Sequence, residues 1–81
     1  MTQLSYPMTR RATDPSAWIN HLFSAKAAMS GGVIRRNIGW VEAEVGRRAL
    51  TEEVQRRGFH MIECGGQFVI ICNRGGLRVV C

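Results

Sequence analysis

Two apolar runs on either side of a glycine pair dominate the second half of the chain. Residues 59–63 and 68–72 are rich in Phe, Met, Ile and Val, and Gly65-Gly66 lies between them. Such a pair is typical of a two-residue β-turn, because both central residues of that turn need a positive φ. The pattern predicts an antiparallel hairpin with these opposite pairs: Cys64 and Gln67, Ile62 and Val69, His60 and Ile71.

Both faces of this hairpin are expected to be largely apolar. Side chains alternate along a strand, so one face should carry Phe59, Met61, Phe68, Ile70 and Cys72. The other, outer face should carry His60, Ile62, Cys64, Val69 and Ile71. A sheet with one solvated face would be polar on that side. We therefore expect a protein partner or a second copy of the chain to cover the outer face, through Ile62, Val69, Ile71 and Val80.

The residues before the hairpin predict three helices. The first should begin at Asp14-Pro15, a capping residue followed by proline, and end near Met29. The second should begin near Val33, because apolar residues recur at helical spacing, and the third should cover 47–57, with Gly58 after it. The stripe of the second helix consists of Ile34, Ile38, Val41 and Val45.

The last nine residues predict a turn and a further strand. Asn73-Arg74-Gly75-Gly76 is a turn sequence, and residues 77–81 are apolar apart from Arg78. We therefore expect an α+β fold in which three helices pack on one face of a three-stranded antiparallel β-meander. Residues 14–81 should form this single small domain, and residues 1–13 a flexible basic arm.

Arginine dominates the charge of the chain. Of its 81 residues, 11 are basic, ten of them arginine, and the net charge is +5. Glu52 and Glu53 precede Arg56 and Arg57 by four residues, so ion pairs should offset the arginines of the third helix. The arginines expected to bind an acidic protein surface or nucleic acid are Arg10, Arg11, Arg35, Arg36, Arg74 and Arg78.

Catalytic and metal-binding patterns are missing from the sequence. Asp14 is the only aspartate, His60 lies between apolar neighbours, and no cysteine or serine has an evident base beside it. The three cysteines have no Cys-x-x-Cys spacing, and Cys72 and Cys81 are expected to be buried as small apolar residues. We expect no enzyme, no cofactor and no metal. The odd cysteine count favours a reducing cytoplasm, and no apolar run is long enough to span a membrane.

The order of three helices followed by a hairpin also suggests a winged helix, with the third helix in the major groove of DNA. Two features count against this interpretation. Glu52 and Glu53 would repel phosphates, and the hairpin is apolar on both faces, whereas a wing tip is usually polar. Direct DNA or RNA binding is therefore the alternative hypothesis.

In its size, its charge and its lack of catalytic residues, the chain resembles small inhibitors from phages and mobile elements, such as anti-CRISPR proteins. These are compact single domains, mostly non-enzymatic, that occupy the nucleic-acid-binding or partner-binding surface of a larger complex. They share no common motif, so the resemblance assigns no residue. It implies a non-enzymatic binding protein that acts by protein–protein contact as an inhibitor of a nucleic-acid-handling complex.

Overall fold

The computed structural model describes residues 14–81, so Arg10, Arg11 and the predicted arm over residues 1–13 lie outside the described residues. The fold is α+β with a three-stranded antiparallel sheet, as predicted. Its helices are α1 (Pro15–Phe23), α2 (Lys26–Met29), α3 (Ile38–Glu44) and α4 (Arg47–Arg56). Its strands are β2 (Val33–Asn37), β3 (His60–Cys64) and β4 (Gln67–Ile71).

The predicted hairpin is confirmed, register included. β3 pairs with β4 so that Cys64 lies opposite Gln67, Ile62 opposite Val69 and His60 opposite Ile71. Gly65 and Gly66 have φ angles of 59° and 78°. The predicted two-residue hairpin turn requires such positive φ values at both of its central residues. The twist of this turn matches the twist of the strands, so the glycine pair determines which residues face each other.

The predicted second helix is wrong over its first five residues, which form β2. This strand pairs with β4, so the sheet order is β2-β4-β3. Valine and isoleucine at 33 and 34 favour a strand, and Ile34 is buried against the core. The helix begins only at Ile38, where Asn37 caps it by accepting a hydrogen bond from Trp40 N at 2.9 Å.

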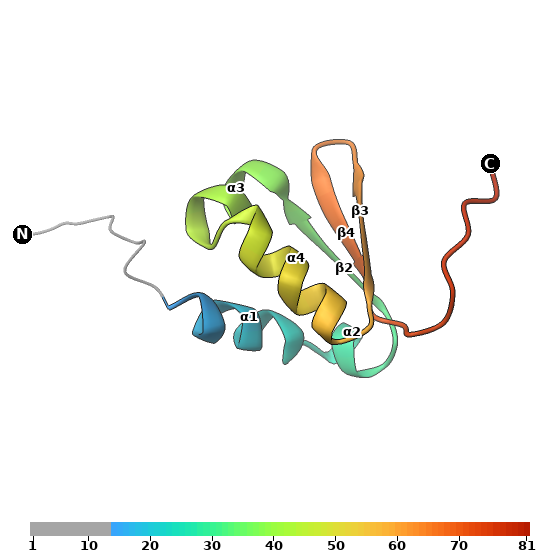
Figure 1. Ribbon diagram of the computed structural model, residues 1–81, viewed down its shortest axis with the longest axis horizontal. Coiled ribbons are helices and arrows are strands. Elements are labelled where there is room, and N and C mark those ends of the chain that lie inside the picture. The colour runs from blue at the N-terminus through green and yellow to red at the C-terminus, as the bar shows by residue number, and fades with distance from the viewer. Residues whose placement is uncertain (1–13) are drawn as a thin grey trace, which may run out of the picture.

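The predicted strand over residues 77–81 is also wrong, and the sheet is not the expected meander. β2 and β3 occupy the two sides of β4, so the tail has no free edge of β4 to pair with. The chain instead leaves the sheet after Ile71, and its last residues extend away from the other elements (Figure 1). Val80 is 89% exposed and does not belong to the outer face, and Cys81 is exposed rather than buried.

The predicted first helix is interrupted after Phe23. Asp14 caps α1 as expected, by accepting a hydrogen bond from Ser16 N at 3.1 Å. Ser24 Oγ then donates to His21 O, and Ala25 is extended, so the chain turns before the short α2. The serine competes with the backbone for a helical carbonyl, which explains the break.

Buried side chains from one face of the sheet and from α1, α3 and α4 form the hydrophobic core. In Figure 1, α4 lies between α1 and α3, and it contacts both. Phe68, Leu50, Ile70 and Val41 are fully buried there. The predicted inner face of the hairpin is therefore confirmed. Burial also raises the pKa of the Cys72 thiol, which remains protonated as an apolar core residue.

Candidate nucleic-acid interface

Helices α3 and α4 form a helix-turn-helix. Only Val45 and Gly46 separate them, and Gly46 has a φ of 92°, which a side chain would disfavour. Val45 is buried, so the turn is anchored in the core. This short connection determines how α4 is presented beside α3.

One side of α4 is buried and the other is exposed and polar. Leu50 and Val54 are four residues apart and face the core, which is why this segment is helical. The opposite side presents Arg48, Glu52 and Gln55, which are exposed. We call these three residues the α4 row. Their side chains are of the types that hydrogen-bond to base edges in the major groove.

Arg47 links α4 to the hairpin. Its guanidinium contacts Glu42 of α3 at 3.0 Å and Glu63 of β3 at 2.5 Å. It also lies over the ring of Phe68, 5.0 Å from the centroid. This residue therefore ties together both helices of the helix-turn-helix and the hairpin.

The only ion pair within the α4 row joins Arg48 Nε to Glu52 Oε2 at 3.0 Å. Both side chains are largely exposed. An exposed pair of this kind contributes about 0–1 kcal/mol, so a phosphate or a base can displace the carboxylate at little cost.

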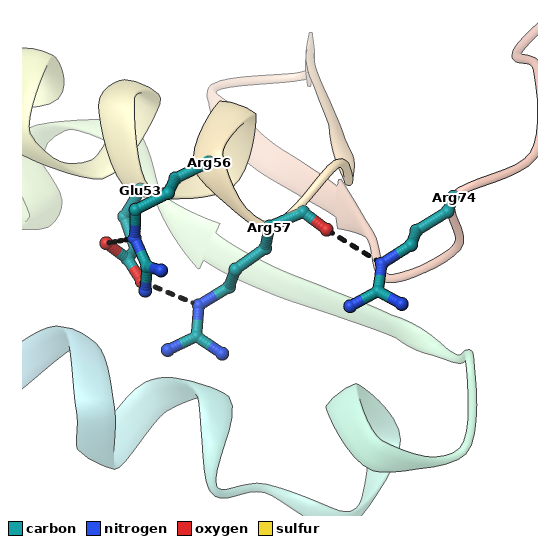
Figure 2. A network of polar contacts seen from close by, with 4 residues as sticks. All are labelled: Glu53, Arg56, Arg57 and Arg74. Carbon is teal, nitrogen blue, oxygen red and sulfur yellow. Dashed lines mark hydrogen bonds and ion pairs between the residues drawn. The ribbon is translucent and has the colours of Figure 1, made fainter.

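Three arginines lie at the C-terminal end of α4, two of them bonded to the Glu53 carboxylate and the third to the backbone of Arg57 (Figure 2). Glu53 accepts from Arg57 Nε at 2.8 Å, as predicted, and it also pairs with Arg56, which was expected to pair with Glu52. Arg74 Nε donates to the backbone oxygen of Arg57 at 3.1 Å. We call Arg56, Arg57 and Arg74 the arginine cluster. It keeps an excess of positive charge, since Glu53 is the one carboxylate that pairs with it, through Arg56 and Arg57, while Arg74 bonds only to a backbone oxygen.

Glu53 makes stability depend on pH. Hydrogen bonds from Arg56 and then Arg57 hold the pKa of this carboxyl below its ordinary value of 4.5, against an opposing effect of burial. Its stabilising contribution is therefore complete above about pH 4.5 and is lost as the pH falls through the lower, folded-state pKa.

We expect Glu53→Gln to be less stable than wild type at pH 7, and to lose less stability between pH 5 and pH 3. Urea denaturation across this pH range measures the difference. Glu44→Gln is the matched control, because no ion pair within residues 14–81 involves Glu44. Parallel pH profiles for wild type and Glu53→Gln would contradict the role of the carboxylate.

The predicted anion-binding arginines do not form one patch. Arg35 and Arg36 are neighbours in β2 and point to opposite faces of the sheet, with Arg35 exposed on the outer face. Arg74 joins the arginine cluster, and Arg78 is exposed in the tail. Within residues 14–81, no ion pair involves any of these four arginines.

The outer face of the sheet is apolar at its centre, as predicted, but its membership differs. Pairing places Ile62, Val69 and Arg35 in one row across the sheet, and His60, Ile71 and Val33 in the next. Val33 therefore takes the place predicted for Val80. Sequence reasoning missed Val33 because the helical spacing of the apolar residues that follow it predicts a helix from this position.

Other kinds of site find no support in the described part of the chain. In residues 14–81, no three His, Cys, Asp or Glu side chains come together as metal ligands. No helix in the same range is long and apolar enough to cross a membrane. Comparisons with protein-family models, with curated proteins and with solved structures found no match.

Proposed function

We propose that this protein binds double-stranded nucleic acid through the α4 row, with the β3–β4 hairpin as an adjacent wing. The observation that carries the proposal is the order of the elements. A helix, a strand, a helix-turn-helix and a hairpin follow one another, and the first strand pairs with the last. This order of elements resembles that of a winged helix, in which the second helix of the helix-turn-helix enters the major groove.

In the sequence, two features count against nucleic-acid binding: the glutamates of α4 and the apolar hairpin. The structure reduces the importance of both. The Glu53 side chain is only 17% exposed and is neutralised by two arginines, so it is not presented to a phosphate. Glu52 belongs to an exposed pair that is easily exchanged. At the tip of the hairpin, Glu63 and Gln67 are exposed, so the wing has a polar end despite its apolar centre.

In this proposal, one set of side chains contacts the bases and another set contacts the phosphates. Arg48 and Gln55 lie on the exposed side of α4, and their side chains can make paired hydrogen bonds to guanine and to adenine respectively. The arginine cluster lies at the C-terminal end of the helix, next to Gln55, and supplies positive charge for contacts with the phosphate backbone. Arg48 and Gln55 would recognise the base sequence, while the arginine cluster would hold α4 at a fixed position along the duplex.

Salt dependence of duplex binding tests this function. Each phosphate contact contributes about −0.9 to the slope of log affinity against log salt, so three contacts weaken binding roughly forty-fold between 50 and 200 mM salt. Fluorescence anisotropy with labelled duplexes of random sequence measures the slope. Arg74→Ala should reduce its magnitude by about one contact. Affinity that is weak and indifferent to salt would contradict the proposal.

A second candidate function is protein binding through the outer face, which would include inhibition of a nucleic-acid-handling complex. It is favoured by the exposure of Val33 and Ile62, 46% and 39%, on either side of Val69 and Ile71. Arg35 lies in the same face and would contact an acidic partner, increasing the rate of association.

A further inference from the structure

A small cleft lies where α1 meets the corner between β2 and α3. Its volume is about 160 Å³, and its lining residues are Trp18, His21, Leu22, Arg36 and Trp40. The Asn37 cap turns the chain directly from the strand into the helix, which brings Arg36 and Trp40 to the same opening. Trp18 and Leu22 are one helical turn apart on α1 and form the opposite wall.

The lining combines flat aromatic surfaces with positive charge. The chain has two tryptophans, and both border this cleft. Trp40 is 52% exposed, which is unusual for a side chain that could gain by burial. Arg36 donates from Nη1 to the oxygen of Arg35 at 2.7 Å, and no ion pair within residues 14–81 involves it. A ligand that fits this lining is planar and aromatic and carries a negative charge.

We propose that the cleft binds a nucleoside phosphate, with the base against the indoles and the phosphate on Arg36. The volume is below the roughly 300 Å³ at which sites for drug-sized ligands begin, so it suits one ring system while the sugar and phosphate stay at the mouth. Exposed His21 lies at that mouth and offers a ring N–H as a further hydrogen-bond donor. A base of any identity can stack on an aromatic side chain, because every base has a π-face. This site is separate from the α4 row and does not depend on duplex binding.

Intrinsic fluorescence provides the test, because both tryptophans report on the cleft. We expect AMP to quench the emission of wild type, and adenosine to quench it only at higher concentration. Arg36→Gln should weaken AMP binding about ten-fold or more, since hydrogen bonds to charged groups contribute about 1.5–3 kcal/mol, and leave adenosine binding unchanged. Arg35→Gln is the matched control, because the adjacent side chain points to the other face of the sheet.

The nucleoside phosphate could be free or the unpaired end of a strand, and two further titrations separate these sources. A blunt duplex is compared with the same duplex carrying a one-nucleotide overhang. If the overhang raises the affinity and Arg36→Gln abolishes that gain, the cleft binds a strand end. If only AMP quenches, it binds a free nucleotide. The proposal is overturned if AMP at about 10 mM causes no quenching and the overhang no gain, or if both arginine variants lose AMP equally.

Discussion

Replacing Phe68 with alanine is expected to lower the free energy of unfolding by about 3–5 kcal/mol. Phe68 is 1% exposed in the central strand β4, and its ring also lies beneath the guanidinium of Arg47. The substitution leaves a cavity where the sheet meets the helices and removes the ring that Arg47 covers. Small domains have a total stability of only about 5–15 kcal/mol, so this variant should be largely unfolded at moderate urea. Urea denaturation followed by circular dichroism measures the change.

Ile62→Glu provides the matched comparison on the opposite face of the same hairpin. Ile62 is half-exposed on the edge strand β3, so the substitution should cost less than about 1 kcal/mol if the outer face is free. Light scattering then shows whether wild type self-associates and whether the new charge prevents it. Equal destabilisation by Phe68→Ala and Ile62→Glu in a monomeric protein would show that the outer face is also core, and would contradict the second candidate function.

Simultaneous replacement of Arg48 and Gln55 with alanine is expected to abolish sequence preference in duplex binding. A paired hydrogen bond to a base contributes about 1–3 kcal/mol of discrimination, so each lost contact should cost roughly 5- to 150-fold in affinity for a preferred site. Both side chains lie on the exposed side of α4, so the fold should be unaffected. Selection from a randomised duplex pool, followed by anisotropy on the enriched sequence, measures the loss.

Arg35→Ala serves as the charge-matched control for this double variant. It also removes an exposed arginine, but from the outer face of the sheet rather than from α4. If α4 reads the duplex, this variant should retain its sequence preference. The same loss in Arg35→Ala and in the double variant would mean that charge alone, and not the α4 row, determines binding.

The hairpin and α4 could be predicted from the chain because their signals are local. The Gly65-Gly66 turn needs two residues of positive φ, and alternation then assigns each side chain to a face. The spacing of Leu50 and Val54, followed by Gly58, similarly identifies α4 and its end. These patterns depend on residues within one or two turns of each other, so no distant contact is needed to interpret them.

Strand β2 could not be predicted in this way, because its residues pair with residues of β4 that lie 30 to 38 positions further along the chain. Ile34, Ile38, Val41 and Val45 fit a helical stripe equally well, and only the free edge of β4 makes the extended form of Val33–Asn37 favourable. Once β2 occupies that edge, the equally apolar tail has no place beside β4.

The candidate sites differ in the same way: some follow from local sequence patterns, and others from contacts between distant segments. The positive charge and the apolar outer face follow from residue types and alternation, which are local properties. The β2-β4-β3 order of the sheet, the contact of Arg74 with the end of α4, and the cleft between Trp18 and Trp40 each join segments that are distant in sequence. Their positions follow from burial of Phe68, Ile70 and Leu50 in one common core, a cooperative effect that no single segment of the chain encodes.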